Sequence, residues 1–325
     1  MIKVLASLAL FIGLWIGGGF ALVALSGPFQ PSGRMVDIGD RKLRLVCQGP
    51  RTELPTVWME AGAWGLAADF AAVQLKLAEK GIRSCAYDRA GMGFSDVGPK
   101  PRDSAAIASD MQKLILASRE RGPFILMAHS MGGQHVRLFA GQNPSEVAGL
   151  VLLEATTPEM INDPQAEKFL SRVRATARTT AVVETLGLLK VAYYYGDRIG
   201  LPPQGKAEKR HAFVSGQHAR TASDEVVVWV EGSHEAGRVK LDPNWPVAVV
   251  TAGDPERMSA WNVARRAPER ESRAGFYENV EAAEHATLLG LTHNAAVIRA
   301  VEHVIAALPP KPQAGANLSA SPLLQ

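Results

Sequence analysis

The sequence predicts an α/β protein whose largely parallel sheet is covered by helices on both faces. Short apolar runs of strand length alternate with longer helical patterns from about residue 56 to 153, and the alternation resumes at residue 246. A helix usually connects successive parallel strands, so alternation of this kind indicates βαβ units. With 325 residues, the chain is long enough for one such domain with an insertion.

Turn residues and apolar patterning define the elements of the first half. The runs 35–38 and 42–48 flank the turn signal Gly39-Asp40 and are expected to pair as a β-hairpin. The other expected elements are strands at 56–60, 82–87, 124–128 and 147–153, and helices at 67–80, 104–121 and 134–141.

The alternation breaks after Pro158. Residues 159–243 are rich in Arg, Ala and Glu with few strand signals, which predicts a helical insertion. The core is therefore expected to comprise residues 28–158 and 244–308. Its second part should contain strands at 246–251 and 276–280 and helices at 259–266 and 294–308. The proline-, alanine- and serine-rich residues 309–325 are expected to form a disordered tail.

Residues 1–27 differ in kind from the rest. Lys3 precedes residues 4–25, which contain no charge and are long enough, at about 1.5 Å per residue, to cross a bilayer of about 30 Å. Ala24-Leu25-Ser26 would be a tolerable signal-peptidase site, but this apolar run exceeds the usual signal core of about 7–15 residues. An uncleaved transmembrane anchor is thus preferred to a signal segment. Both interpretations predict export to the periplasmic or extracellular side.

Composition excludes several classes of protein. The 35 basic and 32 acidic residues give a net charge of +3, and no Lys/Arg cluster with interleaved aromatic residues is present. Nucleic acid is therefore not an expected partner. Two cysteines are too few for a thiolate zinc cluster or a disulfide-rich scaffold.

Ser130 is the residue that points most directly to chemistry. It follows the apolar run 124–128 and His129, and Met131-Gly132-Gly133 then opens the predicted helix. A serine on a sharp strand-to-helix turn has an exposed hydroxyl, with a helix N-terminus and a free backbone N–H beside it. The pattern is G-x-S-x-G with Ala128 at the first glycine, where a small residue is still kept.

Four motifs together resemble the α/β-hydrolase superfamily. They are residues 60–62, 87–96, 129–133 and 151–154, in the family's order, with a histidine late in the chain. The resemblance implies an eight-stranded, mostly parallel sheet with a helical cap at the insertion. It also implies a serine hydrolase without metal or cofactor, acting on a small, hydrophobic acyl substrate. Ester hydrolysis through an acyl-enzyme is expected. Amide or peptide hydrolysis, acyl transfer and a non-catalytic binding role remain alternatives.

The same resemblance implies the catalytic roles. A serine needs a base to remove its proton and an acid to orient that base. His285, beyond the last strand, corresponds to the base. Asp254 is the first choice for the acid, with Glu154 and Glu256 as alternatives. The backbone N–H groups of Met131 and Ala63 are expected to form the oxyanion hole.

Three further regions have competing interpretations. Residues 88–93 resemble a nucleotide loop but lack the G-x-G-x-x-G spacing, so a loop supporting the oxyanion segment is preferred. In the insertion, Tyr193-Tyr194-Tyr195 and Trp229 could line an apolar substrate pocket or only pack the cap. The resemblance also places Cys47 and Cys85 on antiparallel neighbouring strands. It thus implies a disulfide, which agrees with export; two reduced cysteines are the alternative.

Overall fold

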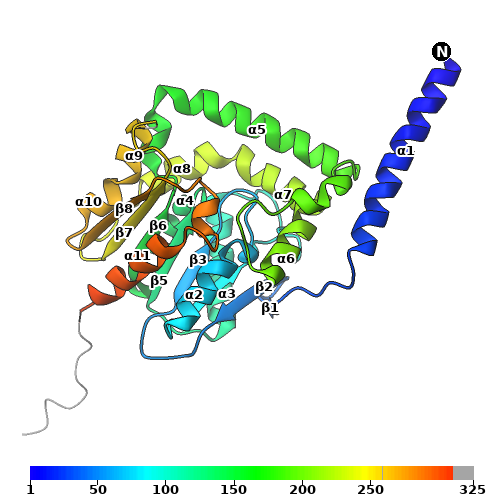
Figure 1. The fold of residues 1–325 in the computed structure, drawn as a ribbon. Coiled ribbons are helices and arrows are strands. Elements are labelled where there is room, and N and C mark those ends of the chain that lie inside the picture. The colour runs from blue at the N-terminus through cyan, green and yellow to red at the C-terminus, as the bar shows by residue number, and fades with distance from the viewer. Residues whose placement is uncertain (258, 310–325) are drawn as a thin grey trace, which may run out of the picture.

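The computed structural model describes residues 1–257 and 259–309. Within this part of the chain, eight strands form one sheet in the order β1-β2-β4-β3-β5-β6-β7-β8 (Figure 1). β2 is antiparallel to both of its neighbours, and all other pairs are parallel. The strands are β1 Arg34–Asp37, β2 Lys42–Gln48, β3 Val57–Glu60, β4 Ser84–Tyr87, β5 Phe124–His129, β6 Val147–Leu153, β7 Val247–Ala252 and β8 Gly275–Val280. This confirms the predicted fold class.

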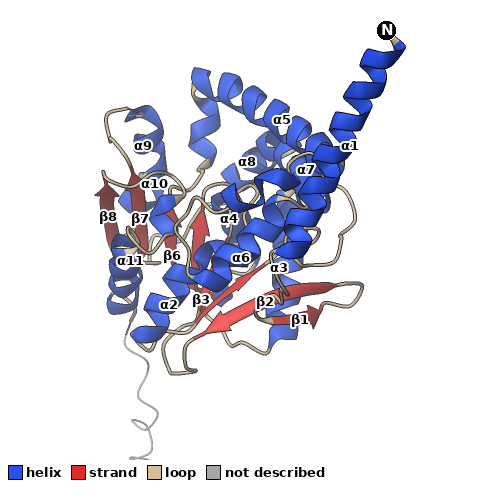
Figure 2. Cartoon of the chain, turned by 45° about the vertical axis from the view of Figure 1, so that its right-hand side comes forward, coloured by secondary structure: helices blue, strands red, loops and turns tan. Residues whose placement is uncertain are grey.

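Helices cover both faces of the sheet and make up most of the insertion (Figure 2). The α-helices are α1 Ile2–Leu25, α2 Ala71–Glu79, α3 Ser104–Ser118, α4 Gly132–Gln142, α5 Pro164–Thr185, α6 Pro203–Phe213, α7 Gly216–Val227, α8 Trp229–Gly237, α9 Ser259–Arg265, α10 Ala267–Glu271 and α11 Ala295–Ala306. The 3₁₀ helices are η1 Ala67–Phe70, η2 Pro144–Glu146, η3 Pro158–Asn162, η4 Lys190–Tyr195 and η5 Thr287–Leu289.

The central strands are apolar because both of their faces are buried. On β5, Ile125 and Met127 belong to the core that includes α2 and α11. Leu126 and Ala128, which alternate with them, belong to the core on the other face with α3 and α4. Successive side chains of a strand point to opposite faces, so a strand buried on both sides shows a continuous apolar run. This packing holds the end of β5, and with it Ser130, in place.

The helical insertion lies between β6 and β7 in the chain. Its helices, η3 to α8, lie over the edge of the sheet toward which β6, β7 and β8 point (Figure 2). The boundaries 159–243 for this insertion, and 28–158 and 244–308 for the core, stay predictions. The tail predicted at 309–325 falls outside the described residues except for Pro309.

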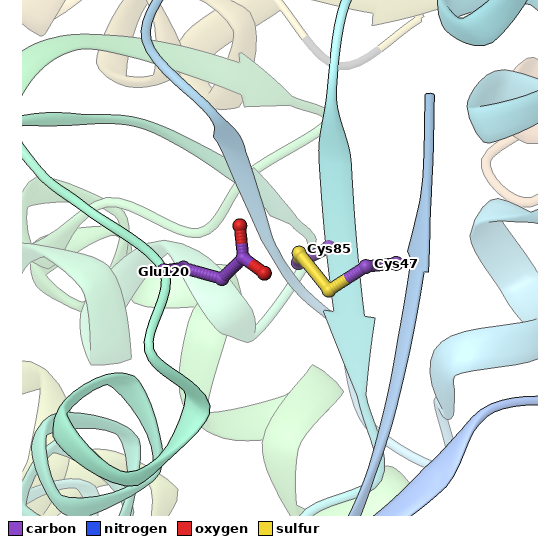
Figure 3. A group of neighbouring side chains, drawn as sticks. All are labelled: Cys47, Cys85 and Glu120. Carbon is purple, nitrogen blue, oxygen red and sulfur yellow. A yellow bond between two sulfur atoms is a disulfide. The ribbon is translucent and has the colours of Figure 1, made fainter. Parts of the chain in front are cut away.

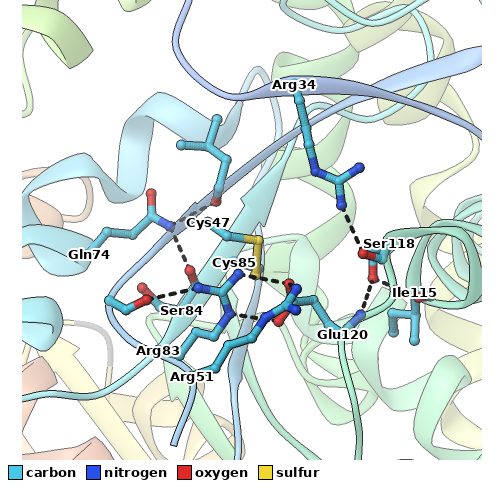
Figure 4. Close-up of a disulfide and its surroundings, with 12 residues drawn as sticks. Arg34, Cys47, Arg51, Gln74, Arg83, Ser84, Cys85, Ile115, Ser118 and Glu120 are labelled. Atoms are coloured by element: carbon cyan, nitrogen blue, oxygen red, sulfur yellow. Dashed lines mark hydrogen bonds and ion pairs between the residues drawn. A yellow bond between two sulfur atoms is a disulfide. The ribbon is translucent and has the colours of Figure 1, made fainter.

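Cys47 and Cys85 form a disulfide, as the resemblance implied. They are direct partners in the antiparallel register of β2 and β4. Glu120 lies beside them (Figure 3) and pairs with Arg51 and Arg83 (Figure 4). Because the two sulfur atoms are bonded to each other, this cluster has no thiolate to offer a metal ion.

Reducing this disulfide is expected to lower the free energy of unfolding by about 4 kcal/mol, because the cross-link closes a loop of 38 residues in the unfolded chain. Urea denaturation of the detergent-solubilised full chain, with and without reductant, measures the difference. A Cys47→Ala/Cys85→Ala double variant is the control and should not respond to reductant. An unchanged wild-type midpoint in reductant would contradict the expectation.

α1 is the one described helix that is long and apolar enough to cross a membrane, judged by length and composition. Gly19 is its only buried residue. The N-terminal half of α1 stands away from the body in both views (Figures 1 and 2), whereas its C-terminal half contacts the insertion.

Candidate active site

Ser130 lies on the turn between β5 and α4. Its φ is +53°, a left-handed conformation that side chains rarely adopt. The turn is fixed because the Ser130 N–H donates to Leu153 O at 3.1 Å and Ser130 O accepts from Thr156 N at 2.8 Å. A Cβ atom on Gly62 would lie only 2.7 Å from Ser130 Cβ. The turn therefore requires small neighbours and presents the serine at the N-terminus of α4.

His285 and Glu154 form a hydrogen-bonded pair close to this turn. His285 Nδ1 donates to Glu154 Oε2 at 3.0 Å. The other oxygen, Oε1, accepts from the Arg265 guanidinium and the Ala252 N–H, each at 3.1 Å. Burial disfavours the charged carboxylate, but the His285 hydrogen bond and the Arg265 charge outweigh it and lower the pKa of Glu154. An ionised Glu154 can therefore orient His285 with its proton on Nδ1.

The other two carboxylates considered for the acid lie elsewhere. Asp254, the first choice from the sequence, is exposed, and its Oδ1 accepts from the Glu256 N–H at 2.9 Å. Glu256 is exposed as well. Among the described residues, Glu154 is the carboxylate hydrogen-bonded to His285. The structure thus brings His285 to Glu154, the second choice from the sequence. The Asp254 carboxylate instead accepts a hydrogen bond within its own turn.

Arg89 fixes the loop that follows β3. Arg89 Nη2 donates a hydrogen bond to Gly62 O at 2.9 Å. The C=O of Gly62 and the N–H of Ala63 belong to one planar trans peptide and point in opposite directions. The Ala63 N–H is thus directed away from Arg89, and Ala63 lines a cavity with Ser130. Within the described structure, neither the Ala63 nor the Met131 N–H has an internal acceptor. Both donors are free for a ligand.

Comparisons with known proteins agree with this architecture. A family model described as the α/β hydrolase fold matches residues 62–186. The enol-lactonase of Burkholderia xenovorans LB400 is 16% identical, with a TM-score of 0.58 over 83% of this chain and 99% of that one. A thermophilic esterase from Thermogutta terrifontis is 19% identical, with a TM-score of 0.60 over 84% and 99%. The chain thus has the α/β-hydrolase fold.

A curated relative extends the likeness in sequence. An uncharacterized protein of Schizosaccharomyces pombe is 26% identical over 208 residues. The match covers 62% of this chain but only 38% of the relative. The chain therefore spans about two fifths of that relative's length.

Two cavities meet at Ser130 and His285, which line both. The first, of about 290 Å³, is apolar and lies under the insertion. Its walls include Met160, Phe169, Leu170, Trp229 and Trp261. The second, of about 460 Å³, is more polar. It is lined by Ala63, Trp64, Tyr195, Arg198, Lys209 and Phe213 among others.

The insertion aromatics therefore divide between lining and packing. Trp229 lines the first cavity and Tyr195 the second. Tyr193 is buried, and its hydroxyl contacts His211 Nδ1 at 2.9 Å. Of the two roles that the sequence left open for these aromatic residues, lining a pocket therefore applies to Trp229 and Tyr195, and packing the insertion applies to Tyr193.

His129 and His218 support the site from behind. His129 Nε2 donates to the backbone carbonyl of His285 at 2.9 Å. Burial and the neighbouring His285 lower the pKa of His129 to about 3, so its ring stays neutral. His218 accepts from Gly93 N and donates to Trp64 O, and burial lowers its pKa to about 3 too. Both histidines hold backbone in position.

The sequence did not indicate the partners of two arginines at the site. Arg265 pairs with Glu154 across 111 residues, and Arg89 pairs with Glu225 across 136. Neither spacing has a local period that could reveal the pair. Arg89 does lie in the 88–93 loop, which the sequence interpreted as support for the oxyanion segment, and its contacts with Ala61 O and Gly62 O agree with that role.

Proposed function

We propose that this chain is a membrane-anchored serine hydrolase that cleaves carboxylic esters. The observation that carries the proposal is the convergence of Ser130 and His285 on the same cavities, with His285 Nδ1 hydrogen-bonded to Glu154. The esterase and the lactonase among the similar structures act on ester bonds by name, which favours this bond over an amide.

The proposed reaction has two steps. The Ser130 hydroxyl attacks the ester carbonyl while His285 Nε2 takes its proton and Glu154 stabilises the resulting imidazolium. The N–H groups of Met131 and Ala63 hold the oxyanion, and each such donor is typically worth about 10²–10³ in rate. The leaving alcohol takes the proton from His285. Water then attacks the acyl-enzyme with His285 as base and frees Ser130. These steps need no cofactor or metal ion.

Fluorophosphonate labelling tests the serine chemistry. We expect wild-type protein to take one label, on the peptide containing Ser130, because an activated serine attacks the phosphorus centre irreversibly. A Ser130→Ala variant with the same thermal stability is the matched control and should remain unlabelled. Equal labelling of both proteins, or of neither, would leave only a non-catalytic binding role.

Product analysis separates hydrolysis from acyl transfer, which the same residues could perform. Ester cleavage in the presence of an added long-chain alcohol should release mainly free acid, with His285 activating water. A new ester as the main product would identify an acyltransferase. A p-nitrophenyl ester series of increasing chain length then measures which acyl group the apolar cavity prefers.

The anchor proposal rests on α1. Its 24 residues are strongly apolar, and almost all of them are exposed. A helix so exposed and apolar is stable in lipid but not in water. We expect protein extracted from membranes to retain residues 1–25 by intact mass. An intact mass that corresponds to a chain starting at Gly27 would instead identify a cleaved signal peptide.

A further inference from the structure

Residues 182–195, in the middle of the helical insertion, form an apolar segment that we call the insertion apex. It comprises the last turn of α5, the following turn and η4. Val182, Leu186, Tyr194 and Tyr195 are 50–69% exposed there. Several exposed large apolar side chains within one short segment make that segment a candidate interaction site.

Neither charged residue of the insertion apex faces outward, and the exposed Arg220 of α7 lies at its border, where its guanidinium donates to Thr185 Oγ1 at 2.7 Å. The two acidic or basic residues of the apex are Glu184 and Lys190. Glu184 is 5% exposed. Lys190 Nζ donates to Val214 O at 3.0 Å and lies 4.7 Å from the centre of the Phe20 ring, so its ammonium is turned toward the protein. This arrangement suits contact with a medium in which an exposed charge is costly.

The partner of α1 in the folded body is this same apex. Trp15 Nε1 donates to Leu188 O at 2.9 Å. A Cβ atom on Gly19 would lie 2.8 Å from Lys190 Cβ, which shows how closely the backbones approach. The contacts lie five to ten residues before Leu25, the end of α1. At the helical rise per residue they are about 8–15 Å along the axis from that end. If α1 spans a bilayer, the apex lies beside it at that depth.

Polar groups begin where α1 ends. Phe29 stacks on His211 of α6 at 3.9 Å, and the Ser32 N–H donates to Glu208 of the same helix. α6 is polar and also carries the Arg210 guanidinium, which lies 5.0 Å from the Tyr194 ring. Arginines and tyrosines at such a boundary are typical of membrane interfaces, where the ring contacts lipid and the cation contacts phosphate.

We propose that the insertion apex is embedded in the bilayer leaflet next to the catalytic body, beside the C-terminal half of α1, and that the ester enters the active site from this leaflet. The inference rests on the proposed anchor. Tyr195 belongs to both features, because it is 69% exposed on the apex and lines the 460 Å³ cavity that reaches Ser130. The substrate class that fits is a lipid-dissolved ester with a long apolar chain.

Depth-dependent quenching tests the embedding. The chain's two cysteines form a disulfide, so an introduced cysteine is the only free thiol. We would attach a nitrobenzoxadiazole fluorophore to full-length Leu186→Cys in phosphatidylcholine–phosphatidylglycerol vesicles and add doxyl-labelled lipids. The matched control is Leu116→Cys on α3, where the leucine is 75% exposed. We expect quenching at 186 to exceed that at 116 at least threefold. Equal quenching at both positions would overturn the inference.

A third position separates this result from the anchor itself. Gly13→Cys lies on α1, where a side chain meets no atom within 4 Å. Quenching at 13 without quenching at 186 would leave the anchor intact and reject the embedded apex. The absence of quenching at 13 would reject the anchor. Fluorophosphonate labelling of each variant reports the serine chemistry and the fold independently of either result.

Substrate delivery has its own readout. A Val182→Glu/Leu186→Glu double variant should cleave a long-chain ester in vesicles about tenfold more slowly, because two carboxylates resist entry into lipid. It should cleave a short, water-soluble p-nitrophenyl ester at the wild-type rate, since neither residue lines the cavities. If the variant cleaved both esters at the wild-type rate, delivery from the leaflet would be rejected.

Discussion

Glu154→Gln is expected to lower kcat by about 10³- to 10⁴-fold, the loss expected when a triad acid becomes an amide. The direction follows from the partners of the carboxylate. Arg265 and the Ala252 N–H both donate to Oε1, so the amide oxygen will take that position. The NH₂ group then faces His285 Nδ1. Nδ1 must accept, the proton moves to Nε2, and the ring can no longer take the proton of Ser130.

The matched controls are Asp254→Asn and Glu256→Gln, both at exposed positions on the neighbouring loop. Each should leave kcat within about twofold of wild type, as expected for surface substitutions outside the site. Steady-state kinetics on one ester measure all three variants, and thermal unfolding checks that each is folded. A large loss with Asp254→Asn and none with Glu154→Gln would assign the acid to Asp254 instead.

The sequence left this acid open for a physical reason. β6 and β7 are adjacent parallel strands, with Leu153 opposite Val250, so their carboxyl ends lie side by side at one edge of the sheet. A carboxylate after either strand is near enough to serve a histidine. The choice depends on the backbone that follows: Glu154 has φ +47°, while Asp254 closes a turn with Glu256. Such local dihedrals cannot be inferred from strand spacing.

Other elements also show which features a local sequence pattern can predict and which it cannot. Strand 147–153 was predicted with the bounds it has, because an apolar run buried on both faces has a clear pattern. The helix expected at 67–80 begins instead as the 3₁₀ turn η1, where the Ala67 N–H donates to Asp88 Oδ1. The short helix α10 was not anticipated. Contacts between distant segments decide these details, and a local pattern contains no information about them.

Arg89→Met is expected to lower the free energy of unfolding by about 3–5 kcal/mol, the usual loss when one partner of a buried ion pair is removed. Arg89 is 2% exposed and pairs with Glu60 from β3 and Glu225 from α7. Removing it leaves two buried carboxylates without their cation. Arg299→Met is the control, since the Arg299 side chain that pairs with Glu278 is 54% exposed, and it should cost below about 1 kcal/mol. Urea denaturation measures both.

Arg89→Lys distinguishes charge from geometry at the same position. Lysine keeps the positive charge but lacks the planar fork with which Arg89 reaches the carboxylates and, at the same time, Ala61 O and Gly62 O. We expect it to recover part of the stability while kcat stays well below wild type, because the peptide carrying the Ala63 N–H loses its support. Full recovery of kcat by lysine would mean that charge alone holds the loop. A folded Arg89→Met protein with wild-type kcat would show that the oxyanion donors do not depend on Arg89.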